Sequence, residues 1–326
     1  MNTSEISIGV DAGSVSTKLA AICGRQIFNK TYLRNKPGLE GKSGCNNISC
    51  NICNDSCSLG FILKIIDAFI DSIQANYSNI KINNCVVTGN QMRNARIIRE
   101  LNERLPTVYI TEIFAHASGV EFLFPGKDLN CAIIEIGGLD SKIIITDNVR
   151  KEINCTNDHS ISVIDSAMNN ICAAGTGAYF ESLAEFLNIS IEDFGRLACK
   201  GFNHVKKNLV SSHCATFARS MFARLQQVYT KDELAAAACK AQADTILSLA
   251  SPMLTKYSRK KIIFQGGVAS NEGMICALQD AFKRKITIPT HPEIEEVNKL
   301  MGALGAAYMA EKYRALINRN VKILTN

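Results

Sequence analysis

The sequence of 326 residues contains no apolar run that approaches the ~18 residues of a membrane-spanning helix. The first ten residues, M-N-T-S-E-I-S-I-G-V, lead directly into a strand pattern and lack the charged and apolar regions of a signal peptide, so we expect none. An excess of one charge is missing too: the formal net charge is only +6, and the basic residues are scattered apart from short runs such as 259–261 and 283–285. We therefore expect a cytoplasmic protein that binds neither a membrane nor nucleic acid.

A disulfide framework is not expected in that reducing compartment. The thirteen cysteines are therefore candidates for metal or redox ligands. Six of them occur singly within apolar strand or helix patterns, where a free cysteine acts as a small hydrophobic side chain; these are Cys23, Cys85, Cys131, Cys199, Cys239 and Cys276. The informative cysteines are Cys172, Cys214 and the group between residues 45 and 57.

An internal repeat organises the chain, whose length suits about two domains. The segments D-A-G-S-V-S-T-K (11–18) and E-I-G-G-L-D-S-K (135–142) both read acid, any, glycine, small, apolar, polar, hydroxyl, lysine. Each follows an apolar strand pattern and precedes another, so each predicts a strand, a tight glycine turn and a second strand. Two matched hairpins at this interval indicate two related halves.

The residue types in both hairpins suit phosphate binding. Glycine and serine remove side-chain bulk, so backbone N–H groups can approach phosphate oxygens, while hydroxyl and lysine side chains add donors and positive charge. The candidates are Gly13, Ser14, Thr17 and Lys18 in the first hairpin, and Gly137, Gly138, Ser141 and Lys142 in the second. Asp11 and Asp140 are candidate catalytic residues that hold Mg²⁺, usually through water, and orient the attacking water.

A third glycine site lies near the end of the chain. Residues 260–265 predict a strand, Gly266 and Gly267 a turn, and the following residues a helix. A flat approach over glycine backbone suits an adenosine, and a helix N-terminus adds a favourable dipole. The segment M-G-A-L-G-A-A-Y-M-A (301–310) predicts a helix whose small residues allow close packing.

These three glycine sites, in this order, resemble the actin, Hsp70 and sugar-kinase superfamily of two-domain ATPases. The resemblance implies two ribonuclease-H-like α/β domains with ATP in the cleft between them. We place the first domain at residues 1–128, with a cysteine-rich insert at 38–58, and the second at 129–326, with the terminal helix crossing back.

Three further motifs narrow the resemblance. The segments T-E-I-F-A-H-A-S-G-V (111–120), N-I-C-A-A-G-T-G (170–177) and S-S-H-C-A-T-F-A (211–218) resemble the activators of 2-hydroxyacyl-CoA dehydratases, which are grouped with the ATPase subunits of benzoyl-CoA reductase as BadF/BadG/BcrA/BcrD-type ATPases. The likeness runs from Ile8 to about Ala310. It implies a homodimer with one [4Fe-4S] cluster between subunits, an electron donor such as ferredoxin or flavodoxin, and a dehydratase or reductase as partner. It also implies that Cys172 and Cys214 are the cluster ligands.

The chemistry of those two cysteines agrees with such a cluster. Each precedes a helix pattern, and a helix N-terminus lowers the pKa of a cysteine and favours an anionic cluster. Two copies of the chain would supply the four thiolates that a [4Fe-4S] cluster needs. Gly175, Thr176 and Gly177 would then touch the nucleotide, so that one loop couples nucleotide to cluster. The alternative is two unrelated buried cysteines.

Some positions depart from the family pattern. Glu135 and Leu139 stand where the second phosphate motif more often has Asp and Gln, and Arg219 replaces an acid shortly after Cys214. The segment T-G-N-Q-M-R (88–93) stands for the usual T-G-Y-G-R. These departures leave the identity of the partner enzyme open, since Arg219 would reverse a charge near the cluster.

The insert places four cysteines in a C-x4-C-x2-C-x3-C pattern within one polar loop: Cys45, Cys50, Cys53 and Cys57. Such a loop can wrap one metal centre. Three interpretations stay open, namely a second iron–sulfur cluster, a zinc site, and thiols without metal. For the whole chain the rival interpretations are a small-molecule kinase of the same fold with structural cysteines, and a non-catalytic metal-bound scaffold.

Overall fold

The computed structural model describes residues 4–35, 58–93, 95–150, 159–169, 176–206 and 209–318. Contacts within the chain divide it into two compact units. One comprises residues 1–125 together with 300–326, and the other comprises residues 126–299. The second unit thus begins near the predicted boundary at residue 128, and the last helix is grouped with the first unit. None of the described helices is long and apolar enough to cross a membrane.

The first unit contains a five-stranded sheet with the order β3-β2-β1-β4-β5. Strands β1, β2 and β3 are joined as antiparallel neighbours, while β4 and β5 run parallel to β1. The strands are β1 (Ser4–Ala12), β2 (Ser16–Cys23), β3 (Gln26–Arg34), β4 (Ile80–Thr88) and β5 (Thr107–Tyr109). The helices are α1 (Ser58–Asn76), the 3-10 turn η1 (Asn90–Arg93), α2 (Ala95–Asn102), α3 (Glu112–Leu123) and α9 (Met301–Lys312).

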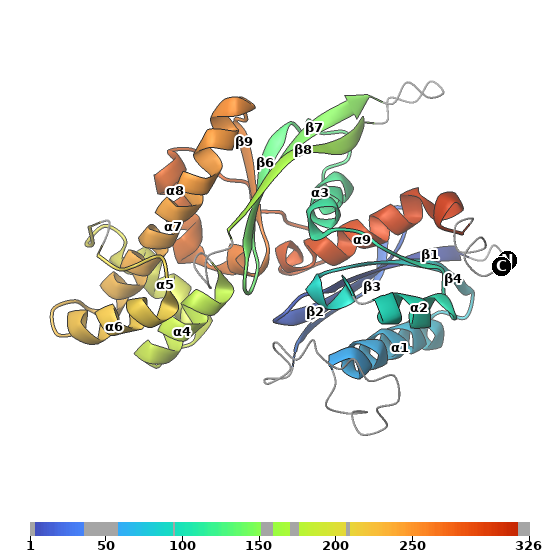
Figure 1. Cartoon of the computed structure of the whole chain (residues 1–326), viewed down its shortest axis with the longest axis horizontal. Coiled ribbons are helices and arrows are strands. Elements are labelled where there is room, and N and C mark those ends of the chain that lie inside the picture. The colour runs from blue at the N-terminus through green and yellow to red at the C-terminus, as the bar shows by residue number, and fades with distance from the viewer. Residues whose placement is uncertain are drawn as a thin grey trace. The chain divides into compact units, whose positions relative to one another are not determined.

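Alternation along β1 explains how this sheet acquires two covered faces. Ile6, Ile8 and Val10 are fully buried and join the hydrophobic core formed with α1 and α2. Gly9 points to the opposite face, where a Cβ atom would lie 2.0 Å from the carbonyl oxygen of Ala303 in α9. A glycine at this position lets α9 pack directly on the sheet, and Figure 1 shows α9 and α1 on opposite faces.

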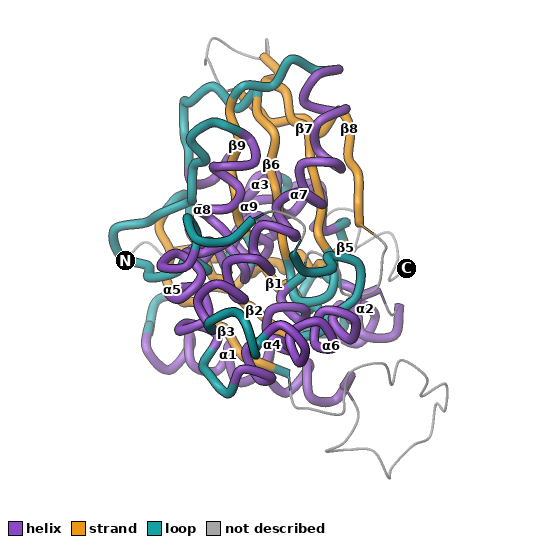
Figure 2. The backbone as a smooth tube through the Cα atoms, turned by 90° about the vertical axis from the view of Figure 1, so that its left-hand side faces the viewer, coloured by secondary structure: helices purple, strands orange, loops and turns teal. Residues whose placement is uncertain are grey.

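The second unit repeats this plan with the sheet order β8-β7-β6-β9. Its strands are β6 (Cys131–Ile136), β7 (Ser141–Arg150), β8 (His159–Asn169) and β9 (Lys261–Gln265). A parallel bridge between Ile263 and Thr287 stands where the first unit has β5. The helices are α4 (Gly177–Leu187), α5 (Ile191–Gly201), α6 (Ala215–Leu225), α7 (Lys231–Lys256), η2 (Gly267–Ser270), α8 (Glu272–Phe282) and η3 (Val297–Lys299), and Figure 2 shows α7 and α8 beside the strands.

The matching strand orders confirm the predicted pair of ribonuclease-H-like α/β domains. The two predicted hairpins are confirmed as well, because β1 pairs with β2 and β6 pairs with β7 in antiparallel registers that place Asp11 opposite Lys18 and Glu135 opposite Lys142. The sequence repeat is therefore a repeat of structure, and the acid and the lysine of each copy are cross-strand neighbours.

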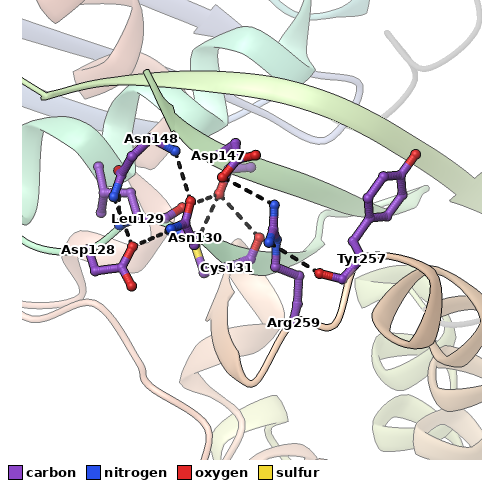
Figure 3. A network of polar contacts seen from close by, with 9 residues as sticks. Asp128, Leu129, Asn130, Cys131, Asp147, Asn148, Tyr257 and Arg259 are labelled. Carbon is purple, nitrogen blue, oxygen red and sulfur yellow. Dashed lines mark hydrogen bonds and ion pairs between the residues drawn. The ribbon is translucent and has the colours of Figure 1, made fainter. Parts of the chain in front are cut away.

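A polar network fixes the end of the β6–β7 hairpin that lies away from its turn (Figure 3). Asn148 Nδ2 donates to Asp128 Oδ1 over 2.8 Å, and the backbone N–H of Asn148 donates to Asn130 Oδ1 over 2.9 Å. Arg259, just before β9, lies 3.4 Å from Asp147 Oδ1. These contacts tie β6, β7 and the start of β9 together, so the opposite end of the hairpin projects its glycine turn from a fixed base.

Candidate functional site

The first glycine turn is closed by a backbone hydrogen bond and an ion pair. The N–H of Gly13 donates to the carbonyl oxygen of Ser16 over 3.0 Å, and Lys18 Nζ lies 3.3 Å from Asp11 Oδ2. The predicted phosphate-binding residues Gly13, Ser14, Thr17 and Lys18 therefore lie in one turn with Asp11 at its edge.

Asn35 braces this turn from beyond the end of β3. Its side-chain amide donates to the carbonyl oxygens of Gly13 and Ser14 over 2.9 and 3.0 Å, and its Oδ1 accepts from the Thr17 hydroxyl. Sequence reasoning missed this residue, because one asparagine after a strand carries no spacing signal. The hydroxyl of Thr17, predicted to be a phosphate donor, is used by the brace in this structure.

The N-terminus of α9 meets Asp11. A Cβ atom on Gly302 would lie 2.6 Å from Asp11 Oδ2, so only glycine allows this approach. The positive end of a helix dipole stabilises a nearby carboxylate. The small residues predicted to serve helix packing at 301–310 do so: at Gly305 a Cβ atom would meet the backbone of Ala115 in α3. They also place a helix N-terminus against the candidate magnesium ligand.

The second turn has the same backbone closure and a more buried ion pair. The N–H of Gly137 donates to the carbonyl oxygen of Asp140 over 2.9 Å. Lys142 Nζ lies 3.0 Å from Glu135 Oε2 and 2.8 Å from Asp140 Oδ1, and its side chain is only 2% exposed. The hydroxyl of Ser141 is buried and has no hydrogen-bond partner within the described part of the chain. It is therefore a candidate donor to a ligand, as the sequence predicts.

The first turn of α4 lies directly on this second glycine turn. The N–H groups of Gly177 and Ala178 donate to the carbonyl oxygens of Gly137 and Gly138 over 2.8 and 2.9 Å. The predicted nucleotide residues Thr176 and Gly177 are thus beside the second hairpin. Gly175, also predicted to touch the nucleotide, lies outside the described residues.

A pair of glycines with positive φ completes the repeat. Gly266, after β9, has φ +95°, and a Cβ there would lie 2.4 Å from the carbonyl oxygen of Ile136. Gly89, after β4, has φ +97°, and a Cβ there would lie 2.3 Å from the carbonyl oxygen of Ala12. Each strand end therefore abuts the residue before its hairpin glycine. The predicted adenosine site at Gly266 has a structural twin at Gly89, which sequence reasoning did not single out.

The Gly266–Gly267 turn is anchored and open at the same time. The N–H of Gly266 donates to the carbonyl oxygen of Asn298, whose side-chain amide donates back to the carbonyl oxygen of Gly266 over 3.2 Å. A Cβ at Gly267 would meet nothing within 4 Å. This geometry agrees with flat access over glycine backbone, and the assignment to adenosine stays a prediction.

Cys214 is the residue that precedes α6, which confirms that this cysteine opens a helix. Hydrogen bonds from the backbone N–H groups of Phe217 and Thr216 hold the pKa of the Cys214 thiol below its ordinary value. Phe217 is 68% exposed although it is a large apolar side chain. The helix thus presents a thiolate-prone cysteine and an apolar ring at the same end.

Arg219, the predicted departure in charge, is paired in this structure. Its guanidinium lies 3.5 Å from Glu185 Oε2 of α4 and 5.9 Å from the centre of the Phe186 ring. Both charged side chains are exposed, so the pair contributes little to stability. It does reduce the charge reversal that Arg219 would bring near Cys214.

Of the other cysteines, Cys23 at the end of β2 is half-buried, and Cys155 lies outside the described residues. Cys172 and the four insert cysteines Cys45, Cys50, Cys53 and Cys57 lie outside the described residues. Cys85, Cys131 and Cys239 are buried, as expected of small hydrophobic side chains. Cys199 and Cys276 each stand singly in their sequence patterns, and the fold brings their Sγ atoms to 3.0 Å. Within the described ranges, no three His, Cys, Asp or Glu side chains are arranged to hold a metal ion.

Comparisons with known proteins agree with this geometry. A family model described as the BadF/BadG/BcrA/BcrD ATPase family matches residues 8–310. The 2-hydroxyisocaproyl-CoA dehydratase activator of Clostridioides difficile is 29% identical over 202 residues, which cover 62% of this chain and 66% of that protein. The (R)-2-hydroxyglutaryl-CoA dehydratase activating ATPase of Acidaminococcus fermentans is 30% identical over 207 residues, which cover 63% of this chain and 69% of that protein.

A solved structure is similar over nearly the whole chain. The crystal structure of component A of the Acidaminococcus fermentans (R)-2-hydroxyglutaryl-CoA dehydratase aligns with a TM-score of 0.69 at 23% identity, and covers 96% of this chain and 100% of that one. This likeness shows a shared fold.

Proposed function

Since the chain belongs to the BadF/BadG/BcrA/BcrD ATPase family, we propose that it is an ATP-dependent activator that passes low-potential electrons to a 2-hydroxyacyl-CoA dehydratase or a related reductase. The names of the relatives support the partner class. The chain matches only 66% of the length of the Clostridioides difficile relative, so the partner is part of the proposal. The observation that carries the proposal is a connection within one unit. The glycine turn of the second hairpin contacts α4, and α4 contacts the segment that leads to Cys214 at the start of α6.

The nucleotide side of the proposal is supported by the polar groups at the turns. Backbone N–H groups and the buried Ser141 hydroxyl are donors of the kind that phosphate oxygens accept. Asp11 lies against the N-terminus of α9. It is a hard oxygen ligand suited to Mg²⁺, and we assign Asp11 and Asp140 to holding the ion and orienting water. Lys142 keeps Glu135 and Asp140 in fixed positions beside the turn.

The electron-transfer side is supported by the chemistry of Cys214. A thiol whose pKa is lowered by backbone N–H groups is a thiolate donor of the type that iron–sulfur centres require. Cys214 and Cys172 from each of two copies would hold one [4Fe-4S] cluster. Such a cluster supplies one-electron chemistry at low potential. Phe217, whose backbone N–H donates to the Cys214 thiol, exposes its apolar ring at the same helix end.

Purification without oxygen tests this proposal. The bridging cluster should contribute about four atoms each of iron and acid-labile sulfide per dimer, as one [4Fe-4S] cluster requires. Cys214→Ser and Cys172→Ser should each lose the iron and keep ATP hydrolysis, whereas Cys23→Ser is the matched control at a half-buried cysteine and should keep both.

The same preparation separates the rival interpretations. Changing the four insert cysteines to serine should lower the iron content below that of the unchanged chain only if the insert carries a second iron–sulfur centre. The activator would be supported if the chain reduces a purified dehydratase, and if this reduction requires both ATP and ferredoxin or flavodoxin. A colourless monomer that phosphorylates a small molecule would replace it with the kinase.

A further inference from the structure

The second glycine turn is joined to Cys214 by a short path of hydrogen bonds, and this path begins with α4. The first turn of that helix donates two backbone hydrogen bonds to the Gly137–Gly138 turn. Any displacement of this turn therefore displaces the N-terminus of α4, because a helix moves as a rigid element on this scale.

The next step along the path is Tyr179, in the same first turn of α4. Its side chain is fully buried, and its hydroxyl donates to the carbonyl oxygen of Ser211 over 2.8 Å. The ring lies edge-on to Phe180, with ring centres 5.5 Å apart, so the side chain has little room to change rotamer. The hydroxyl and the glycine turn are thus attached to one turn of helix.

The last step is the segment from Ser211 to Cys214. Gln242 of α7 donates to the carbonyl oxygen of Ser212 over 3.0 Å, and the N–H of Ser211 donates to the Met221 sulfur of α6. Cys214 follows two residues after Ser212 and opens α6. The segment is therefore held between α4, α7 and α6, and Tyr179 provides its hydrogen bond to α4.

We propose that Tyr179 is a positioning residue that transmits the nucleotide state of the second glycine turn to Cys214. The inference rests on the proposed function only in taking the Gly137–Gly138 turn as a nucleotide contact. It does not require Cys214 to carry a cluster. Further along α4, Phe186 packs on Phe222 of α6 with ring centres 6.1 Å apart, so a second contact supports the same helix pair.

The test measures the rate at which iodoacetamide alkylates Cys214 in the full, iron-depleted chain, by peptide mass mapping. The rates with ADP and with a non-hydrolysable ATP analogue should differ in the wild type by about fivefold, the ratio that one hydrogen bond can impose. Tyr179→Phe removes only the hydroxyl, and it should bring this ratio close to one while nucleotide affinity and ATP hydrolysis stay within about twofold.

Two further variants make the result decisive. Tyr257→Phe removes a hydroxyl hydrogen bond of the same length, 2.8 Å to Asp165, in the same unit, and it should keep the wild-type ratio. Gln242→Met removes both the donor to Ser212 and the hydrogen bond between Gln242 and Tyr179, and it should lower the ratio as Tyr179→Phe does. Tyr179→Phe and Gln242→Met together keep the test decisive if one of them folds poorly.

The results that would overturn the role of Tyr179 differ from those that would overturn the proposed function. A wild-type ratio of one, or a ratio unchanged by both Tyr179→Phe and Gln242→Met, overturns the role of Tyr179. Neither result bears on iron content, which is measured separately, and loss of iron binding in the wild type would overturn the activator while leaving this inference standing.

A second inference comes from Cys199 of α5 and Cys276 of α8. Their Sγ atoms lie 3.0 Å apart, and both residues are half-buried. A disulfide bond is ~2.05 Å long, so a shift of about 1 Å would join them. The two helices approach closely here, because a Cβ on Gly273 would lie 2.3 Å from Ala198 Cβ.

We infer that Cys199 and Cys276 form a reversible disulfide in the presence of a small-molecule disulfide. One cysteine thiolate attacks the small disulfide and releases one small thiol, and the second cysteine then attacks the mixed disulfide and releases the other. The two cysteines together lose two protons and two electrons, and the small disulfide takes them up and becomes two small thiols. Burial, together with the neighbouring Cys276, raises the pKa of the Cys199 thiol to about 12, so the exchange is slow at neutral pH and faster in alkali.

Incubation of the full chain with oxidised glutathione tests this pair. Mass mapping without reductant should find the peptide of Cys199 linked to that of Cys276, and dithiothreitol should reverse the link. Cys199→Ser and Cys276→Ser should each abolish it, whereas Cys131→Ser, at a buried cysteine whose Sγ lies 3.2 Å from the Thr146 hydroxyl, should keep it. A chain in which both thiols stay open to alkylation at pH 9, or in which the link joins Cys239, overturns the inference.

Discussion

In the first hairpin Lys18 lies 3.3 Å from one carboxylate and is 16% exposed, whereas in the second Lys142 lies within 3.0 Å of two carboxylates and is 2% exposed. The first turn is braced by a side chain of its own sheet, Asn35. The second is braced by backbone N–H groups of α4. One sequence pattern thus produces two turns with the same backbone closure and different supports.

Under the proposed function, this difference distinguishes the turn that can transmit the nucleotide state. A turn supported by Asn35, just beyond the end of β3, is coupled mainly to its own sheet. A turn supported by α4 is coupled to whatever α4 contacts, and in this chain that includes the segment before Cys214. The second hairpin is therefore the copy placed to communicate with the cysteine.

The largest expected difference between the hairpins is in stability. Lys142→Met should lower the free energy of unfolding by about 3–5 kcal/mol, because it leaves Glu135 buried without its charged partner. Lys18→Met should cost only about 2 kcal/mol, since its ion pair is better solvated. Urea unfolding followed by circular dichroism measures both. Equal losses would mean that burial does not distinguish the two lysines.

A smaller effect is expected at the twin glycines. Gly89→Ala and Gly266→Ala should each lower the free energy of unfolding by about 2–3 kcal/mol, because positive φ strains alanine and a backbone carbonyl occupies the place of its Cβ. Gly24 and Gly126 are matched controls with positive φ and open space, and alanine there should cost about 1 kcal/mol. If alanine at Gly89 or Gly266 costs no more than alanine at the control positions, the two glycines are not structurally equivalent.

The hairpins, their strands and the two related halves could be predicted from the sequence, because glycine between two apolar runs directly favours a tight turn between strands. The helix after Cys214 could also be predicted, because its sequence pattern is local. These features depend on residues within one or two elements of each other.

The braces and the cysteine pair could not be predicted in this way. Asn35 acts from beyond the end of a neighbouring strand, and Cys199 and Cys276 are 77 residues apart in the chain. No spacing or motif in the sequence distinguishes Tyr179 from the other apolar and aromatic positions of α4. Its hydroxyl gains a partner only when α4 and the segment at Ser211 are both in place. Contacts of this kind depend on packing, which periodicity does not encode.

Removal of the brace should affect the first hairpin alone. Asn35→Ala should raise the dissociation constant for ATP about tenfold, the equivalent of ~1.4 kcal/mol, because the carbonyl groups of Gly13 and Ser14 lose their donor. The nucleotide response of Cys214 should persist at saturating ATP. Asn29→Ala, which removes a hydrogen bond from β3 to Ser72, is the control and should leave affinity unchanged. Isothermal titration measures the affinities, and an unchanged value for Asn35→Ala would contradict a role for the brace.

The smallest expected effect concerns the end of the path from the second turn. Hydrogen bonds from Phe217 and Thr216 hold the pKa of Cys214 below its ordinary value. Alkylation of Cys214 in the iron-depleted chain should therefore reach half its maximal rate at a lower pH than a free cysteine, for which it lies near ~8.5. Since the folded chain favours the thiolate, this group stabilises the fold above its unfolded pKa, and the contribution is lost as pH falls through the folded value. Thr216→Val should raise the midpoint slightly, because it removes only the side-chain hydrogen bond and leaves both backbone donors. A midpoint at or above that of free cysteine would show that the N-terminus of α6 does not favour the thiolate. The path from the second hairpin would then reach Ser211 without affecting the chemistry of Cys214.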